Sequence, residues 1–377
     1  MALILLPMFA AAAEGTAPAE SASMSSSSAG TGFFENPLDY LLGRHLFERE
    51  TFGGNGRTCL TCHSRETGTV SPKDARLRFA RNPLDPLFKA DGSDDGAGNG
   101  ASRMLEHATV LVRIPLAPNV RLLQEPDARS VVVARSIPST LNTPALEPVL
   151  MQDGRQPDLV SQARGAIFDH AQPKRSPKAR ELDLISAFQH TPTFFSSPTM
   201  LLYAYAGVTP RLPAGRTPEE IRGRRFFVDA PVGGDFKSGV CAHCHSGPML
   251  NETNEFVPFP PFRRGGRFAT IGVSEMNVAG NPVREFEFTN PDGTKTVVSS
   301  PDPGRALING SLDVESLNAF RIPSLWGAPR TAPYFHDNSA GTLEEVVAHY
   351  ARLFGSFGLV LTEQEQRDMV AYMKLLK

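Results

Sequence analysis

Apolar residues recur at helical spacing near the C-terminus of the chain. Two runs there, Thr342-Leu-Glu-Glu345 and Thr362-Glu-Gln-Glu365, carry a threonine followed three residues later by glutamate, which is the capping-box pattern of a helix start. Apolar residues then follow at intervals of three and four, as on the buried face of an amphipathic helix. We therefore predict two final helices, with apolar positions Val346, Val347, Tyr350 and Leu353 in the first and Met369, Val370, Tyr372, Met373 and Leu376 in the second.

Shorter elements are predicted along the earlier part of the chain. Residues 159–167 have helical periodicity, and Thr217-Pro218-Glu219-Glu220 combines a capping box with a proline at the first helical position. The β-branched runs 110–114 and 131–134 predict two short strands. The polar, glycine-rich run 91–100 predicts a loop.

The N-terminus has an apolar run followed by small residues. Residues 1–10 are mostly apolar and three alanines follow, which is typical of an export signal cut near Ala13, although the usual basic residues are missing. A buried N-terminal helix is the alternative, because the run is too short to cross a bilayer. We expect a signal peptide at 1–13, a flexible linker rich in Ala, Ser, Gly and Thr at 14–32, and a location in the periplasm.

The composition is that of a loop-rich globular protein. Of the 377 residues, 41% are hydrophobic and 21% are charged, which is enough apolar material for real cores. The length favours two or three domains. A net charge of −2 gives no reason to expect nucleic acid or an anionic membrane surface as a partner. The 32 prolines and 32 glycines favour long loops between short helices, and no later apolar run is long enough for a membrane span.

All four cysteines lie in two Cys-x-x-Cys-His runs. This spacing suits covalent c-type haem attachment, in which both thiols bond the haem vinyl groups and the next imidazole binds the iron. A zinc ribbon would need its pairs roughly 15–20 residues apart and no histidine after each pair. A thioredoxin-like pair usually occurs once, whereas structural disulfides remain an alternative in an oxidising compartment. The doubled run favours two covalently bound haem c groups, attached at Cys59, Cys62, Cys241 and Cys244, with His63 and His245 as iron ligands.

Similar sequence precedes both runs. Gly43-Arg44-His45-Leu46-Phe47 lies before the first and Gly223-Arg224-Arg225-Phe226-Phe227 before the second, each at the end of a short amphipathic helix. We interpret this as an internal repeat of one cytochrome c unit, against the alternative of two ordinary helices that share a glycine and a phenylalanine. The predicted fold is mainly α, with cytochrome c-like domains at 33–208 and 214–377 joined by loop-rich segments.

Several further motifs stand in one order around the two haem motifs. They are Asp153-Gly154-Arg155 with Leu159 and Gln162, Pro303-Gly304-Arg305, Phe320-Arg-Ile-Pro-Ser-Leu-Trp-Gly327 and Thr331-Ala-Pro-Tyr-Phe-His336. Together they resemble the bacterial dihaem cytochrome c peroxidases and MauG-type enzymes. The resemblance runs from about Gly43 to the C-terminus, apart from the segment 64–134, which is longer than usual.

The resemblance implies a peroxidatic N-terminal haem and a C-terminal haem that stores or relays an electron. His63 would then be the proximal ligand of the reactive iron and His245 that of the relay iron. The family's distal glutamine matches Gln162, but its acid/base glutamate has no match. We expect His170 in its place, because an imidazole with a pKa of about 6.5 can take a proton from peroxide and return it to the leaving oxygen. The alternative is a helix-end histidine bonded to a backbone carbonyl.

The resemblance also concerns the sixth ligand of the C-terminal haem, which is Met in the peroxidases and Tyr in MauG-type members. That place is Tyr350 here. A phenolate favours ferric and higher oxidation states, whereas a thioether favours ferrous iron. Tyr350 would therefore let this haem share oxidising equivalents. The alternative is a core aromatic at this position, with His349 or Met249 binding the iron instead.

Two positions depart from the family pattern. Gln152 stands where the family has a tryptophan between the haems, and the single tryptophan, Trp326, is either a packing residue or an electron relay. The family's inter-haem calcium uses a Thr-x-Pro that matches Thr331 and Pro333, but its asparagine is Ser136 here. A hydroxyl is a poorer calcium ligand than an amide oxygen, so calcium is left open.

These observations predict a dihaem c-type oxidoreductase that reduces hydrogen peroxide at the N-terminal haem with electrons relayed through the C-terminal haem. A plain peroxidase would take electrons from a small cytochrome c or cupredoxin, whereas a MauG-type enzyme would oxidise a partner protein. The alternative is a non-catalytic dihaem electron-transfer cytochrome. In that protein Met104, His107 or His190 would close the first haem, with the segment 64–134 as its lid.

Overall fold

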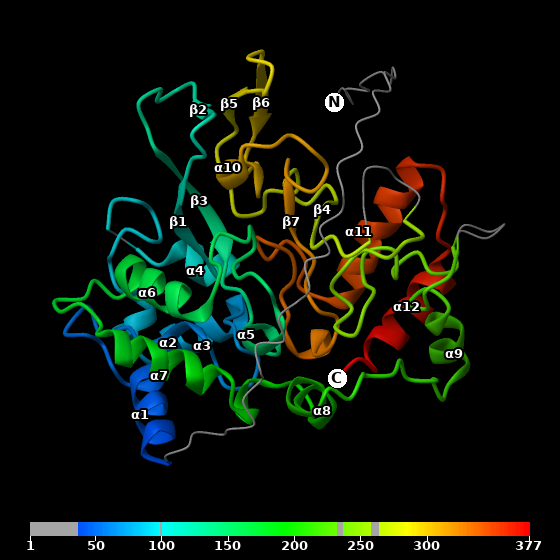
Figure 1. Cartoon of the computed structure of the whole chain (residues 1–377), viewed down its shortest axis with the longest axis horizontal. Helices are drawn as coiled ribbons and strands as arrows, with labels where there is room; N and C mark the ends of the chain where they lie inside the picture. The colour runs from blue at the N-terminus through cyan, green and yellow to red at the C-terminus, as the bar shows by residue number, and fades with distance from the viewer. Residues whose placement is uncertain (1–36, 99, 232–236, 258–263) are drawn as a thin grey trace, which may run out of the picture. The chain divides into compact units, whose positions relative to one another are not determined.

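Short helices border both haem motifs in the computed structural model, which describes residues 37–98, 100–231, 237–257 and 264–377 (Figure 1). The signal peptide and linker predicted at 1–13 and 14–32 lie outside these residues. The helices are α1 Pro37–Glu48, α2 Cys59–Cys62, α3 Pro72–Arg81, α4 Ser102–His107, α5 Thr143–Leu146, α6 Leu159–His170, α7 Ala179–Gln189, α8 Pro198–Ala206, α9 Pro218–Arg224, α10 Ala306–Asn309, α11 Leu343–Ser356 and α12 Glu363–Met373, with single 3₁₀ turns at Pro86–Phe88, Pro192–Phe194 and Ala328–Arg330.

The helices predicted from capping signals are confirmed. Thr217 caps α9, Thr342 caps α11 and Thr362 caps α12, each by accepting a hydrogen bond from the backbone N–H three residues later. Asp158 caps α6 in the same way through the N–H of Ser161. Each cap satisfies a backbone donor that the first turn of a helix leaves without a partner.

Three small antiparallel sheets accompany the helices. The strands are β1 Thr109–Pro115, β2 Val120–Leu122, β3 Ser130–Ser136, β4 Phe268–Thr270, β5 Arg284–Thr289, β6 Lys295–Ser300 and β7 Ala319–Arg321. Strands β1 and β3 pair with each other, which confirms the two strands predicted from β-branched runs. The other sheets have the orders β2-β5-β6 and β4-β7 (Figure 1). The mainly α prediction therefore describes the surroundings of the haem motifs but omits these sheets.

Strand β2 belongs to the first half of the sequence but pairs with β5 from the second half. Hydrogen bonds near the haem motifs also cross between the halves. The Ser136 N–H donates to the His336 carbonyl over 2.7 Å, and the Arg330 side chain donates to the Glu66 carbonyl over 2.7 Å. The two halves are thus hydrogen-bonded to each other, and the division into domains at 33–208 and 214–377 stays a prediction.

The glycines of the predicted repeat occupy equivalent places. A β-carbon at Gly43 of α1 would lie 2.6 Å from the Leu184 carbonyl oxygen of α7, and one at Gly223 of α9 would overlap the Asp368 carbonyl oxygen of α12. Only glycine permits such close contact between helix backbones. In both halves, therefore, the helix before the haem motif packs against a later helix through its glycine, which supports the interpretation as a repeat.

Each haem motif has its own apolar core. The first core is formed by α1, α6 and α7 and includes the ring contacts of Phe188 with Phe47 and Phe194. The second is formed by α8, α11 and α12 together with Phe226 and Phe227, which follow α9, and Trp326. Burial of these aromatic side chains supplies most of the packing energy around each motif. Further cores lie under the sheets and around Leu87 and Met104.

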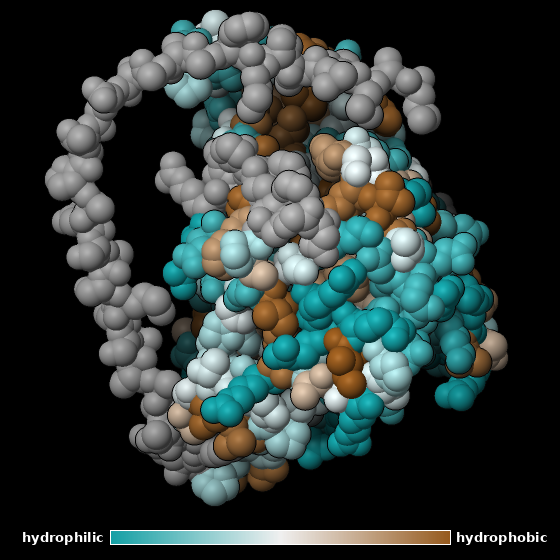
Figure 2. All heavy atoms as spheres, turned by 90° about the vertical axis from the view of Figure 1, so that its right-hand side faces the viewer, coloured by the Kyte–Doolittle hydropathy of each residue, from teal (hydrophilic) through white to brown (hydrophobic). Residues whose placement is uncertain are grey.

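The surface over α9, α11 and α12 is predominantly hydrophilic, with hydrophobic residues in small separate groups (Figure 2). Exposed apolar side chains in these parts of the sequence include Ile221 and Phe357. Isolated residues of this kind are common on globular proteins. Among the described residues, no helix combines the length and the apolar character that a bilayer span requires.

Candidate functional site

The first haem motif borders a cavity of ≈ 170 Å³. The motif forms the single turn α2, in which the Thr58 backbone N–H donates to the Thr61 hydroxyl over 2.9 Å. Residues three apart on a helical turn project from the same face. Cys59 and Cys62 accordingly both line the cavity, and so does His63 directly after them.

The His63 ring is held by the backbone of the loop that follows it. Its Nδ1 lies 2.8 Å from the Gly68 carbonyl oxygen. A hydrogen bond at Nδ1 leaves Nε2 as the free nitrogen and fixes the orientation of the ring, as in many metal-ligating histidines. Burial also lowers the pKa of His63, which favours the neutral form that binds metals. The geometry suits an iron ligand facing the cavity.

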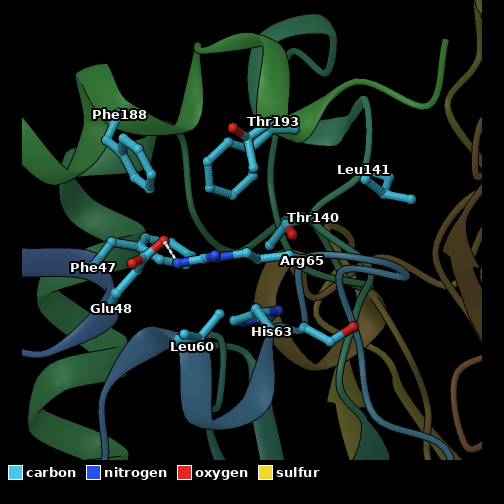
Figure 3. A pocket seen from close by; sticks show the side chains of 11 residues that line it. Phe47, Glu48, Leu60, His63, Arg65, Thr140, Leu141, Phe188 and Thr193 are labelled. Carbon is cyan, nitrogen blue, oxygen red and sulfur yellow. Dashed lines mark ion pairs between the residues drawn. The ribbon is translucent and has the colours of Figure 1, made fainter. Parts of the chain in front are cut away.

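A small pocket of ≈ 10 Å³ lies beside His63. In Figure 3 the Arg65 side chain extends across the pocket above Leu60 and His63 and meets Glu48 of α1. The Arg65 Nη2 and Glu48 Oε1 atoms are 2.5 Å apart. The pocket has room for about one water molecule. His63 is therefore closely packed on the side of this small pocket. The larger cavity of ≈ 170 Å³ borders His63 as well.

The cysteines are free thiols in apolar surroundings. Burial and, secondarily, the neighbouring Cys62 raise the pKa of Cys59 to about 12. A zinc site or a reactive dithiol needs thiolates, which form in electropositive, partly exposed places. The surroundings therefore fit thioether attachment of an apolar macrocycle better than a reactive dithiol.

Helix α6 supplies the wall that carries the predicted catalytic residues. Gln162 and His170 both line the cavity, together with Ala163 and Ala166 between them. Asp169, next to His170, also lines the cavity but is exposed to solvent. The structure thus places both predicted residues at the cavity that Cys59, Cys62 and His63 border. Their roles stay predictions.

The surroundings of His170 bear on the alternative of a purely structural histidine. Within the described ranges no hydrogen bond holds its ring; its backbone carbonyl accepts one from the Asn55 side chain over 2.9 Å and one from Arg57 over 3.4 Å. Burial lowers the pKa of His170, and the neighbouring Asp169 opposes this shift. The imidazole is therefore largely neutral near pH 7 and able to accept a proton.

The long segment 64–134 provides another wall of the same cavity. Leu87, Met104 of α4, Val110 and Val112 line it. Met104 is the one alternative ligand for the first haem that lies at the cavity, because His107 and His190 are not among its lining residues. Closure of the iron by the segment would therefore depend on the Met104 thioether.

Three arginines at the cavity had no role in the sequence predictions. Arg57, Arg155 and Arg321 all line it. Arg321 comes from β7 in the second half of the chain, and its Nη1 lies 2.5 Å from Oε1 of the almost fully buried Glu147. Arg155 and Arg321 stood in recognised motifs, but Arg57 did not. The pairing of Arg321 with Glu147 had no signal in the sequence, because the two residues are remote in the chain.

The second haem motif repeats the geometry of the first. The His245 N–H donates to the Cys241 carbonyl over 2.9 Å, as that of His63 does to Cys59 over 3.0 Å. The His245 Nδ1 lies 2.9 Å from the Leu250 carbonyl oxygen, again five residues along the chain. Burial raises the pKa of Cys241 to about 12 and that of Cys244 to about 11. Both motifs thus hold free thiols and an oriented imidazole.

Tyr350 of α11 lies close to the second motif. Burial raises its pKa well above the ordinary value, and nearby Cys244 and Cys241 raise it further. The adjacent His349 is engaged elsewhere, since its Nε2 lies 2.7 Å from the Ile271 carbonyl oxygen. Met249 is buried in the apolar core of the second half. The contact of His349 disfavours that alternative, and the choice between Tyr350 and Met249 stays a prediction.

Trp326 is hydrogen-bonded to residues near both haem motifs. Its indole N–H donates to the Pro248 carbonyl over 2.9 Å, three residues after His245, and its own carbonyl accepts from the Asn142 side chain over 2.9 Å. Asn142 follows Leu141, which lines the pocket beside His63. Packing accounts for its burial, and the question of a relay stays open.

The residues considered for calcium make hydrogen bonds of their own. The Gln152 side chain donates to the Ser136 hydroxyl over 2.6 Å, and the Thr331 hydroxyl donates to the Ala328 carbonyl over 3.3 Å. Among the described residues no group of three or more His, Cys, Asp or Glu side chains is arranged for a metal ion. The Gln152 amide therefore contacts the hydroxyl of Ser136, the weakest of the residues matched to calcium ligands. These contacts give the calcium prediction no support.

No protein-family model matches the chain, but curated relatives do. Cytochrome-c peroxidase IdrP1 of Denitromonas iodatirespirans is 28% identical over 149 residues, 36% of each chain. Cytochrome c551 peroxidase of Nitrosomonas europaea is 26% identical over 141 residues, 37% of this chain and 31% of the relative. Methylamine utilization protein MauG of Methylorubrum extorquens is 36% identical over 67 residues, 16% of this chain and 19% of the relative.

A solved structure of a MauG-like protein associated with microbial copper homeostasis has a TM-score of 0.49 and 21% identity, covering 90% of this chain and 88% of that one. The alignments with these two cytochrome c peroxidases span only about a third of the length of each relative. Relatives of two kinds, peroxidases and MauG, nevertheless match the one chain. The resemblance of this chain to the bacterial dihaem cytochrome c peroxidase and MauG family is confirmed by these relatives.

Proposed function

We propose that the chain binds two haem c groups covalently and reduces hydrogen peroxide at the first. The thiols of Cys59 and Cys62 would attach one haem, with His63 as its iron ligand. One observation carries the proposal: Gln162 and His170 line the same cavity as this attachment site. An attachment site alone would serve an electron carrier equally well. A glutamine and a neutral histidine at the same cavity favour chemistry on a small ligand.

The reaction combines hydrogen peroxide with two protons and two electrons to give two molecules of water. The bound haem would supply the iron at which peroxide is reduced. His170 would take the proton from the peroxide oxygen nearer the metal and return it to the departing oxygen. The Gln162 amide would donate a hydrogen bond that orients the peroxide. His63, oriented by Gly68, would hold the metal.

The second motif would attach the other haem through Cys241 and Cys244, with His245 and Tyr350 as ligands. An arginine can bind a haem carboxylate through paired, charge-assisted hydrogen bonds. Arg155 and Arg321, both at the first cavity, are suited to that part. A phenolate ligand at the second haem favours MauG-type oxidation of a partner protein, whereas the peroxidase relatives favour a small cytochrome or cupredoxin as electron donor. Export to the periplasm belongs to the same proposal, since the N-terminal sequence resembles an export signal.

Met104 supports a second candidate function. This buried thioether lines the first cavity, and as a sixth ligand it would turn the protein into a dihaem electron carrier without catalysis. Such a protein would show low-spin iron at both haems and no peroxide turnover above that of free haem.

Replacement of the proposed iron ligand tests the function. His63→Gly should abolish the reaction with peroxide while the spectrum of the second haem stays nearly intact, because the two motifs are held by separate cores. His107→Gly, outside the cavity lining, should leave both intact. Loss of both haem spectra in His63→Gly would contradict the two-site arrangement. If His63→Gly retained the peroxide turnover of the parent, the assignment of the reactive site would be contradicted.

A further inference from the structure

Arg57 connects three parts of the chain around the first cavity. Its buried guanidinium group donates hydrogen bonds to the carbonyl groups of Pro86 at 3.0 Å and of Leu87 and Lys89 at 3.2 Å. It forms an ion pair with Asp91, which is also buried. A further hydrogen bond of 3.4 Å reaches the His170 carbonyl at the end of α6. A single side chain thus joins the start of the haem motif, the long inserted segment and the helix that carries His170.

The carboxylate of Asp91 balances the charge of Arg57. Asp91 and the backbone carbonyls accept hydrogen bonds from nearly all of its N–H groups. An arginine has five N–H donors, and burial without partners would be costly. Asp91 is in turn held by Ser93, whose hydroxyl donates to it over 2.6 Å. The ion pair is therefore part of a fixed network, and its members have little freedom to move relative to α6.

The same network sets the charge around His170. The charged groups that act on this imidazole are Asp169 on its own helix, Arg57 before the haem motif, Asp91 in the inserted segment and Arg155 after β3. Asp169 and Asp91 favour the protonated ring, whereas Arg57 and Arg155 disfavour it. Arg57 and Asp91 carry opposite charges. Removal of Arg57 should therefore raise the proton affinity of His170, and removal of Asp91 should lower it.

We propose that Arg57 is a positioning residue for the proton-accepting imidazole of His170, which it holds at the cavity through the His170 carbonyl and the ion pair with Asp91. This inference rests on the proposed function, since it assigns His170 the proton transfer. The inserted segment is then more than a lid, because through Asp91 it contributes to the charge that tunes the reaction. Arg57 also lines the cavity itself, close to where a ligand would be bound.

Two variants that break the same ion pair provide the test. The readouts are the rate of peroxide reduction and the rate of hydrogen cyanide binding to the ferric protein, each as a function of pH. Both processes need a group that accepts a proton, but cyanide binding involves no turnover. In Arg57→Gln the pH midpoint should rise by roughly one unit, and in Asp91→Asn it should fall by a similar amount. A merely structural ion pair would move both midpoints in the same direction or leave both unchanged, and either result would overturn the inference.

Further variants keep the test decisive. Arg57→Lys retains the charge but has fewer donors, so the midpoint should stay near that of the parent while both rates fall. If Arg57→Gln does not accumulate as folded protein, the other two variants still give different expectations: the midpoint should fall in Asp91→Asn and stay near that of the parent in Arg57→Lys. Arg78→Gln is the matched control. Arg78 belongs to the inserted segment, where it pairs with Asp85 over 2.6 Å, and it donates to the Thr61 carbonyl of the haem motif, but it does not line the cavity. Its midpoint should equal that of the parent.

The failure of the inference differs from the failure of the proposed function. If His170→Gln leaves the pH dependence of the parent unchanged, His170 is not the proton acceptor and the proposed function is wrong in that part. If His170→Gln removes the dependence but the Arg57 and Asp91 variants shift it in the same direction, the function stands and the role of Arg57 is rejected.

Discussion

The Nδ1 atom of His63 lies 2.8 Å from the carbonyl oxygen of Gly68. Gly68 adopts a left-handed backbone conformation with φ +69°, and a β-carbon there would lie 2.6 Å from the Thr140 backbone nitrogen. Gly68→Ala should therefore displace the carbonyl and free the imidazole to rotate. We expect an altered absorption spectrum of the first haem and a loss of roughly 10- to 100-fold in peroxide reduction.

Gly207→Ala is the matched control for this variant. Gly207 is also left-handed, at φ +66°, but a β-carbon there would meet no atom within 4 Å. Both variants bear a similar conformational cost of about 1 kcal/mol. Only Gly68→Ala should change the first haem, and equal spectra in the two variants would show that the carbonyl does not orient His63.

His170→Gln should reduce the rate of peroxide reduction by roughly 10²- to 10⁴-fold, the usual contribution of a general acid or base. In the parent the rate should fall as the pH drops through the folded pKa of His170, which burial places below the ordinary value of 6.5. The neutral form above that pKa is the active one. A pH–rate profile measures both effects, and a parent rate that increases towards acid pH would be inconsistent with His170 as the acceptor.

Tyr350→Phe should change the low-spin EPR signal of the C-terminal haem and leave the first haem as it is. The phenol oxygen is the only atom removed, so a change reports loss of a ligand. Tyr334→Phe is the control, because the Tyr334 hydroxyl donates to the Ala328 carbonyl over 2.9 Å and has no proposed metal contact. An unchanged low-spin signal in Tyr350→Phe would reject this tyrosine as the ligand.

The buried ion pairs of Arg135 predict a pH-dependent stability effect. Its guanidinium lies 2.5 Å from Asp153 and 2.7 Å from Asp302. Burial alone would raise the pKa of Asp302, but Arg135 outweighs it and holds that pKa below the ordinary value. The pair therefore stabilises the fold above the unfolded carboxyl pKa, and this contribution is lost as the pH falls through the folded pKa.

Arg135→Met should lower the free energy of unfolding by about 3–5 kcal/mol at pH 7, because it leaves a buried carboxylate without its partner. The loss should shrink at acid pH, where that carboxyl is protonated. Glu287→Gln, which breaks the exposed pair with Lys295, should cost less than about 1 kcal/mol. Denaturant unfolding at several pH values measures both, and a loss independent of pH would point to packing alone.

The elements with strong local signals could be predicted from the sequence. Capping boxes located α9, α11 and α12, and β-branched runs located β1 and β3. The family resemblance was the basis for expecting Gln162 and His170 near the haem, and both line the cavity. In these cases the deciding interactions lie within a few residues of each other.

The remaining features depend on contacts between distant residues. Strand β2 has only three residues, and its partner β5 lies in the other half of the chain. The hydrogen bond from Arg57 to the His170 carbonyl spans 113 positions. The Glu147–Arg321 pair is likewise remote and buried. No periodicity or motif encodes such pairings, because they arise only when the folded chain brings the segments together.

A pyridine haemochrome assay of the purified, matured protein, combined with an EPR spectrum of its resting state, tests the covalent attachment of two haems with one open iron. The predicted result is two covalently bound haems per chain, with one high-spin ferric signal from the His63 site and one low-spin signal. A colourless protein, pigment that acid–acetone extracts, or two low-spin irons would contradict it.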